Sequence, residues 1–178
     1  DQLADHLRGL GVKVILSTPV TRIEAHPAGG VTAAYGSQTE RFDQVLVTTS
    51  PGQLARLAPA LPAGYLQGLL DLKSMGAVVM VLALKHQLSE KGYYWYNLPK
   101  SAGYPFLALV EHTNFVSPDH FGGDHIVYIG DYLDTDHEFF HLSQEELLER
   151  FLPVLPRFNP SFQRDWIRKV WLFRTHYA

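Results

Sequence analysis

An uninterrupted apolar run from Gly76 to Leu84 constrains the fold of this chain more than any other feature. The run is rich in valine, a β-branched residue that fits the pleated surface of a strand. Apolar side chains at successive positions give a strand two apolar faces, as in strands that are covered on both sides. The run therefore predicts a long strand with both faces apolar.

The residues that follow this run predict further strands and a helix. Glycine, proline, serine and asparagine turns separate the expected strands, which lie at residues 93–97, 106–114, 125–133 and 168–178. Ser143 and Glu146 form a capping box at a helix start, and Pro153 disturbs the end of that helix. Its inward side chains are those of Leu147, Leu148, Phe151 and Leu152. This part predicts an α+β fold: a mostly antiparallel sheet with packed helices.

The first third of the chain predicts smaller pieces. A helix that Asp1 caps and Gly11 ends carries leucines on one stripe. Strands are expected at 12–16, 20–26, 31–35 and 41–49, with a glycine hairpin between the second and third. Val45, Leu46 and Val47 suggest that the last of these strands is buried on both faces. Residues 52–72 predict helix interrupted by prolines, and the first 62 residues are expected to make no complete core alone.

Composition excludes several classes of function. The 178 residues are 46% hydrophobic and 19% charged, which is typical of a globular protein with a core. A net charge of −3 with scattered basic residues argues against nucleic acid as a partner. No stretch reaches the roughly 20 apolar residues of a transmembrane segment. The chain has no cysteine, which excludes disulfides and thiolate ligands and is compatible with the expected cytoplasmic location.

The two ends suggest a piece of a longer protein. The sequence starts without methionine inside a helical pattern and stops inside an expected strand. Natural termini usually end in mobile polar residues. We therefore expect an internal fragment whose partners are a small-molecule substrate and the rest of its own protein, whereas the oligomeric state is not indicated.

Two segments carry a resemblance to a known family. They are residues 10–23, with Val20 and Ile23 at the positions of a V-x-x-I pattern, and residues 42–51, which run Phe-Asp-Gln-Val-Leu-Val-Thr-Thr-Ser-Pro. Their order around a glycine hairpin resembles flavin-containing amine oxidases and protoporphyrinogen-oxidase-like enzymes. The remainder is similar to the substrate-side lobe of that family, through residues 110–114, 127–132 and 174–178.

The resemblance implies an FAD-dependent oxidoreductase that oxidises an amine or a related C–H substrate by hydride transfer to flavin. It implies that residues 1–62 are part of an FAD-binding domain and that residues 63–178 are a substrate-binding domain. Val20 is expected to contact the adenine edge of the flavin cofactor through its backbone. Ser50 and Pro51 are expected either to border the cofactor or to form a plain turn.

The same resemblance implies weak cofactor binding by these residues alone. The family holds the FAD pyrophosphate on a G-x-G-x-x-G turn between a strand and a helix N-terminus. Here Gly9 and Gly11 follow an expected helix instead, and so offer carbonyls where amides are needed. The fragment is therefore expected to be inactive and not to hold FAD tightly.

A metal motif gives one alternative. His137, Glu138 and His141 match H-E-x-x-H, in which two histidines on one helical face bind zinc and the glutamate is a general base. The capped helix at Ser143 begins directly afterwards, which places the motif in the preceding turn. We therefore expect no metal site here. A zinc hydrolase and a non-catalytic ligand-binding module remain the alternatives to a flavoenzyme.

Aromatic and acidic residues give weaker candidates. Residues 93–96, Tyr-Tyr-Trp-Tyr, either line a substrate cavity with alternate rings or pack within the sheet. Trp166, Trp171 and Phe173 are expected in the core. A general base could be drawn from a set of acidic residues and one histidine, but the sequence assigns no catalytic residue. That set is Glu111, His112, Asp131, Asp134 and Asp136.

Overall fold

A computed structural model describes residues 2–178, and its contacts divide the chain into two compact units, Asp1–Lys73 and Ser74–Ala178. Each unit is described by itself. The expected cap at Asp1 lies outside the described residues. Within residues 2–178, no helix combines the length and the apolar character that crossing a membrane requires.

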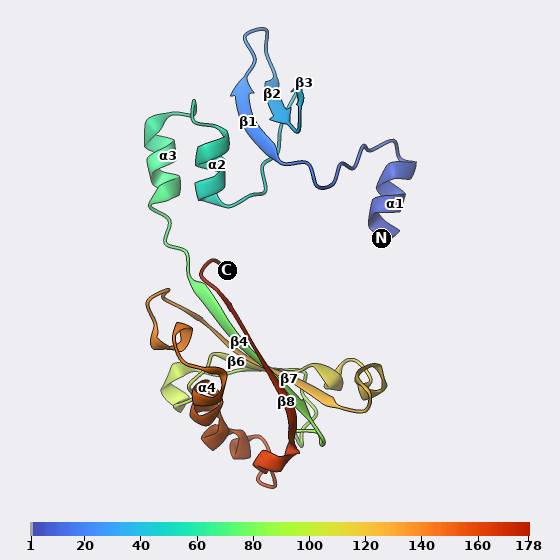
Figure 1. Ribbon diagram of the computed structural model, residues 1–178, viewed down its shortest axis with the longest axis vertical. Helices are drawn as coiled ribbons and strands as arrows, with labels where there is room; N and C mark the ends of the chain where they lie inside the picture. The colour runs from blue at the N-terminus through green and yellow to red at the C-terminus, as the bar shows by residue number, and fades with distance from the viewer. Residues whose placement is uncertain (1) are drawn as a thin grey trace. The chain divides into compact units, whose positions relative to one another are not determined.

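The first unit contains three short helices and a three-stranded antiparallel meander (Figure 1). In chain order its elements are α1 (Gln2–Gly9), β1 (Val20–Ala25), β2 (Val31–Tyr35), β3 (Gln38–Phe42), α2 (Pro51–Leu57) and α3 (Ala63–Leu70). These elements confirm the expected first helix, the glycine hairpin and the interrupted helical stretch. Gly11 follows α1 with φ of +83°, a conformation that glycine adopts at little cost.

The hairpin between β1 and β2 depends on Gly30. Its φ is +78°, and a Cβ atom at this position would lie 2.5 Å from the carbonyl oxygen of Phe42. The amide of His26 donates to the Gly30 carbonyl oxygen at 3.0 Å and closes the turn. A side chain at position 30 would therefore both strain the backbone and collide with β3.

Two predicted strands of the first unit are wrong. Residues 12–16 form no strand. The strand expected at 41–49 ends at Phe42, the last residue of β3, and Leu46 is 89% exposed rather than buried. Their apolar patterns are those of strands, but a strand is defined by hydrogen bonds to a neighbour. Neither residues 12–16 nor residues 45–47 have a ladder partner among the residues that the structure describes.

Very little of the first unit is buried. Over residues 2–73, Ala33 and Ala58 are the only buried residues. Leu3, Leu10 and Leu16 are all more than 60% exposed. Two alanines cannot offset the conformational entropy of a unit of this size. The prediction that this segment makes no complete core alone is therefore confirmed.

The second unit is built on a five-stranded antiparallel sheet in the order β5-β6-β7-β4-β8. The strands are β4 (Gly76–Leu84), β5 (Trp95–Asn97), β6 (Ala108–Glu111), β7 (His125–Leu133) and β8 (Ile167–Thr175). The unit also contains one α-helix, α4 (Gln144–Phe151). Its 3-10 turns are η1 (Lys100–Ala102), η2 (His112–Asn114), η3 (Pro118–Phe121), η4 (Glu138–Phe140), η5 (Leu152–Arg157) and η6 (Arg164–Trp166). The predicted α+β class and the long strand at β4 are confirmed, and β4 lies between β7 and β8 in the sheet.

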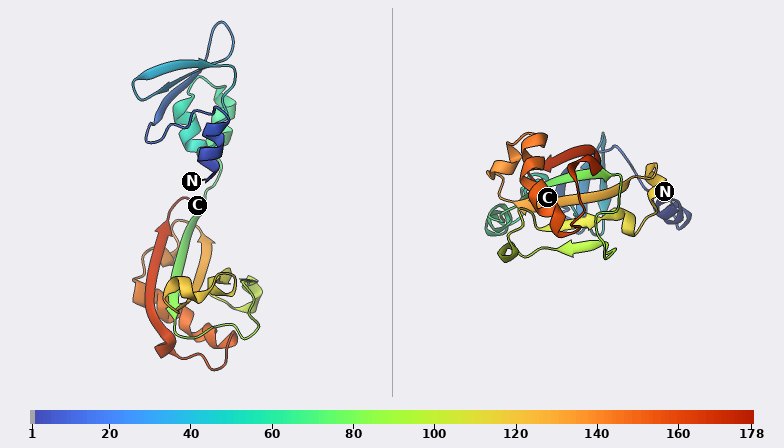
Figure 2. Two further views of the ribbon diagram at one scale, coloured as in Figure 1. Left: turned by 90° about the vertical axis from the view of Figure 1, so that its right-hand side faces the viewer. Right: turned by 90° about the horizontal axis from the view of Figure 1, so that it is seen from below.

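One face of this sheet is covered by helix α4 and the turns that follow it (Figures 1 and 2). Alternate residues of β4, such as Met80 and Leu82, point to this face and are fully buried. They pack in one cluster with Leu147 and Phe151 of α4 and with Leu155 of η5. This cluster is the main core of the chain.

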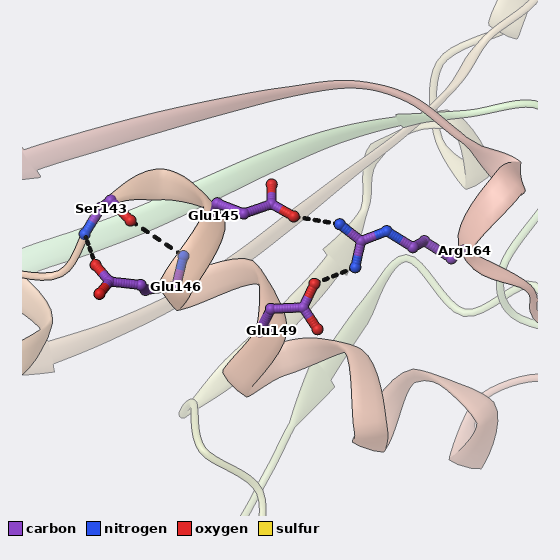
Figure 3. A network of polar contacts seen from close by, with 5 residues as sticks. All are labelled: Ser143, Glu145, Glu146, Glu149 and Arg164. Carbon is purple, nitrogen blue, oxygen red and sulfur yellow. Dashed lines mark hydrogen bonds and ion pairs between the residues drawn. The ribbon is translucent and has the colours of Figure 1, made fainter.

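The capping box at the start of α4 is present as the sequence predicted (Figure 3). The Ser143 hydroxyl accepts from the Glu146 amide at 3.2 Å, and the Glu146 carboxylate accepts from the Ser143 amide at 2.7 Å. These hydrogen bonds lower the pKa of Glu146. Further along, the Arg164 guanidinium bridges the carboxylates of Glu145 and Glu149. The helix is therefore fixed at its start and along its exposed side.

Candidate functional site

The second face of the five-stranded sheet is covered in part, where Phe121 of η3 packs with Val81, Ala83 and Ile126. The rest of this face is open and carries the candidate site, and we call the whole of it the free face. Strand register defines four rows of side chains across this free face, of which the fourth contains Lys169, Ala83 and Ile126. The first row contains Thr175, Ala77 and Tyr132. The second row contains Phe173, Val79, Gly130, Ala108 and Asn97. The third contains Trp171, Val81, Tyr128, Val110 and Trp95.

Small residues in the second row create a hollow of about 390 Å³. Ala108, Gly130 and Val79 lie opposite one another on β6, β7 and β4, with Ala77 beside them, and they form its floor. Tyr128 and Tyr132 stand on either side of Gly130 along the same strand and rise above this floor. The hollow is therefore a product of residue size: small side chains surrounded by large aromatic ones.

The aromatic walls of the hollow are held in place by neighbouring groups. The Trp95 indole N–H donates to Asn97 Oδ1 at 2.7 Å, which fixes the ring of Trp95. The His112 ring meets the Tyr128 ring edge to face, with centroids 5.8 Å apart. Tyr94 packs beside Trp95 at a centroid distance of 6.5 Å. The walls are therefore preorganised before any ligand arrives.

Asp131 is the only acidic residue among the described residues that line the hollow. In the strand register it pairs with Val78, whose side chain points to the covered face. Burial raises the pKa of Asp131, whereas the Tyr132 amide, Lys100 and His137 act to lower it. Its carboxyl group therefore belongs to the covered side of the sheet and contributes little charge to the free face.

The aromatic predictions are confirmed in part. Trp95 lines the hollow, whereas Tyr96, one residue later, packs against the core, as expected for adjacent strand residues. Tyr94 also lines the hollow and breaks the expected alternation, because β5 begins only at Trp95. Trp166 and Trp171 are partly buried against apolar clusters. Phe173 was predicted in the core, and this is wrong: it lies on the free face and is 58% exposed.

Glu111 has a structural role in the second unit. Its carboxylate is fully buried and accepts from the amides of Leu88 at 2.6 Å and Ser89 at 2.9 Å, and from the Asn114 side chain at 2.9 Å. Burial raises the pKa of Glu111, and these hydrogen bonds oppose that rise. The carboxylate ties the segment after β4 to β6 and does not face the hollow. Of the other residues in the acidic set, His112 and Asp131 line the hollow.

The H-E-x-x-H motif lies in a turn, as the sequence predicted. His137 precedes the short turn η4, and its Nδ1 accepts from the Phe139 amide at 3.2 Å. The Glu138 carboxylate pairs with Arg150 at 3.3 Å. The motif is not on one continuous helical face, and residues 2–178 contain no group of three or more side chains placed to hold a metal ion. The geometry therefore does not support a zinc centre.

A second hollow, in the first unit, contains Val20. It measures about 440 Å³, and its walls include Ile15, Val20, Tyr35 and Phe42. Val20 begins β1, opposite Tyr35, at a point where the register of the β1–β2 ladder shifts. Lys13, Thr18 and Glu40 also line this hollow, so its walls are of mixed character. The contact of Val20 with a cofactor stays a prediction.

Ser50 and Pro51 open helix α2. Ser50 is the N-cap, and its hydroxyl accepts from the Gln53 amide at 3.3 Å, while Pro51 occupies the first helical turn. Both residues therefore have a complete local explanation as helix-start residues. Their contact with a cofactor stays a prediction.

Sequence reasoning missed the floor residues Ala108 and Gly130. A small residue within a strand gives no signal by itself, because only the register shows what stands beside it. The register here brings together residues from β4, β6 and β7 that are far apart in the chain. The sequence feature that came closest to indicating the hollow is the pair of tyrosines, Tyr128 and Tyr132, on either side of Gly130.

One family model and several solved structures match the chain. The family model described as flavin containing amine oxidoreductase matches residues 1–177. An oxidoreductase structure from Methanosarcina mazei is similar over 98% of this chain, with 15% identity and a TM-score of 0.72. Putrescine oxidase bound to putrescine is similar over 97%, with 16% identity and a TM-score of 0.61. Cyclohexylamine oxidase from Brevibacterium oxydans IH-35A is similar over 88%, with 20% identity and a TM-score of 0.59.

The chain spans a limited share of these structures, namely 41%, 37% and 34% of their respective lengths. At these identities the likeness shows a shared fold. No curated protein matches the chain.

Proposed function

The chain belongs to the flavin containing amine oxidoreductase family, and from that membership we propose that the intact protein is an FAD-dependent oxidoreductase acting on a small molecule. When bound, the flavin supplies the chemistry by accepting a hydride from a C–H bond of an amine or a related substrate. The observation that carries the substrate side of this proposal is the preorganised hollow on the free face of the sheet. Its volume of about 390 Å³ lies in the range of small-molecule sites.

The residues of this chain would bind and orient the substrate and exclude water. Trp95, Tyr128 and Tyr132 supply apolar surface, and the contacts of Trp95 with Asn97 and of Tyr128 with His112 limit the conformational entropy that these two rings lose on binding. Asn97 and the tyrosine hydroxyl groups supply the few polar contacts that set an orientation. We propose that residues 63–178 are the substrate-binding domain on this basis.

The first 62 residues would contribute one edge of the FAD site. The hollow beside Val20 supports a contact with the adenine, and Ser50 and Pro51 are proposed to border the cofactor from the start of α2. The G-x-G-x-x-G turn that holds a pyrophosphate does not occur in this sequence. We therefore propose that residues 1–178 alone do not bind FAD tightly and are inactive.

Flavin content tests this proposal. The intact protein, purified with FAD supplied, should show a flavin absorption spectrum at about one flavin per chain, and the same flavin should be released on denaturation. The isolated 178 residues, treated in the same way, should retain none after gel filtration. Stoichiometric flavin on the isolated chain would contradict the weak-binding proposal, and a colourless intact protein would contradict the oxidoreductase.

A further inference from the structure

The free face of the sheet is almost without charge. Among its paired positions that the structure describes, Lys169 is the only charged residue, and its Nζ lies 4.8 Å from the centroid of the Trp171 ring. Asp131 points to the covered side, as its pairing with Val78 shows. A substrate ammonium group on this face would therefore meet no carboxylate and would share the face with a lysine.

Attraction between an ammonium and an aromatic ring does not replace a carboxylate here. Such contacts are worth about 0.5–1 kcal/mol at exposed sites, and Trp95 and Tyr132 are both more than half exposed. Desolvating a charged group without an ionic partner costs more than that. The face as built favours contacts with uncharged apolar surface.

The floor of the hollow is wide enough for a ring. Tyr128 and Tyr132 are four residues apart on β7, which separates their Cα atoms by about 13 Å along the strand. Across the strands, β4, β7 and β6 span about 10 Å. Ala77, Ala108 and Gly130 leave this area open, so a bicyclic aromatic or a conjugated ring can lie on it with its edges against the tyrosines.

We propose that this hollow holds an uncharged, planar part of the substrate, an aromatic or conjugated ring system, in preference to an aliphatic di- or polyamine. The inference rests on the proposed function, because it assigns the substrate class of the same enzyme. The preference for planar rings over aliphatic amines would come from two features: the floor made by Ala108 and Gly130, and the ring of Trp95 that Asn97 holds in place.

The test compares two probes on the FAD-supplied intact protein by equilibrium dialysis. The probes are 2-naphthylmethanol, which is planar and uncharged, and 1,4-diaminobutane, which is aliphatic and doubly charged. We expect the naphthyl probe to bind at least about tenfold more tightly, since burial of its rings on apolar surface has no counterpart in the diamine. A diamine that binds as tightly as the naphthyl probe would overturn the inference.

Two variants locate the binding in the hollow. Ala108→Leu fills the floor and should weaken naphthyl binding by about tenfold or more, whereas Trp95→Ala removes one wall and should weaken it by about fivefold. Tyr65→Ala is the matched control, because Tyr65 is 53% exposed, as Trp95 is, and does not line the hollow. If Ala108→Leu fails to fold, Trp95→Ala carries the test, since its side chain is half exposed. Unchanged naphthyl affinity in a folded Trp95→Ala protein would overturn the inference.

The flavin spectrum of the same samples separates this inference from the proposed function. Naphthyl binding that responds to Trp95→Ala in a protein without flavin would contradict the oxidoreductase and leave the ring site standing. A flavin-bound protein that prefers the diamine would contradict the ring site and leave the oxidoreductase standing.

Discussion

Ala108 on β6 lies directly opposite Gly130 on β7, so two of the smallest side chains meet at one position of the sheet. Tyr128 and Tyr132 stand on either side of Gly130. This pairing explains why an otherwise regular antiparallel sheet has a hollow on its free face. The stabilities of alanine variants at Gly76 and Gly130 test how much space surrounds these two positions of the sheet.

Gly76→Ala should destabilise the protein more than Gly130→Ala. A Cβ at position 76 would lie 2.4 Å from Phe140 Cζ and 2.7 Å from the Thr175 carbonyl oxygen, whereas at position 130 the nearest atoms are 3.2 Å away. Overpacking should cost Gly76→Ala about 1–3 kcal/mol. Gly130→Ala should stay within about 1 kcal/mol of the wild type, because reduced freedom of the unfolded chain offsets the tighter contact. Urea unfolding of both variants measures this, and the reverse order would contradict the packing described.

Glu111→Ala should lower the free energy of unfolding by about 2–4 kcal/mol, because it leaves the buried amides of Leu88 and Ser89 without their acceptor. Glu90→Ala provides the control, since Glu90 lies next to Ser89 but is exposed. Chemical unfolding at neutral pH compares the two. Equal stability of the two variants would show that the carboxylate does not anchor this segment.

Ser143→Ala should destabilise the protein by about 1 kcal/mol through loss of the α4 cap. Ser101→Ala, at an exposed position of η1, should have no comparable effect. Thermal unfolding followed by circular dichroism measures the difference. A Ser143→Ala protein as stable as the wild type would mean that α4 gains nothing from its capping box.

Stability should fall in mildly acidic solution because of His125. Burial and the nearby His86 lower the pKa of His125, while Asp124 opposes the shift. The folded protein therefore prefers the neutral ring, and the stability this contributes is complete above the unfolded value of about 6.5 and is lost as the pH falls through the lowered pKa. Its Nδ1 is buried without a hydrogen-bond partner, so protonation there gains nothing.

The measurement is the change in unfolding free energy between about pH 7.5 and about pH 5.5. His125→Gln should show a smaller loss of stability over this interval than the wild type. His120→Gln, which replaces an exposed histidine, should keep the wild-type loss. An equal loss in all three proteins would exclude His125 as the group responsible.

Local patterns predicted those parts of the fold whose causes are local. The valine-rich run from Gly76 to Leu84 forms β4, and Ser143 with Glu146 begins α4, because side-chain character and capping act within a few residues. The segments at 12–16 and 45–47 were predicted as strands and are wrong, since a strand also needs a partner that the pattern does not supply.

The candidate site was less predictable for the same reason. Apolar residues on both faces of β4 did not show which face a helix covers, so Phe173 was predicted in the core although it is exposed. The alternation of Trp95 and Tyr96 was predictable from strand geometry. The floor of the hollow was not predictable, because it depends on the pairing of Ala108 with Gly130 and thus on the register between β6 and β7.

The visible absorption spectrum of the intact protein, recorded before and after denaturation, tests the central claim most directly. Our account predicts a protein-bound flavin at about one per chain that is released on unfolding and is bleached when an oxidisable substrate is added without oxygen. A folded intact protein that stays colourless after purification with FAD would contradict it.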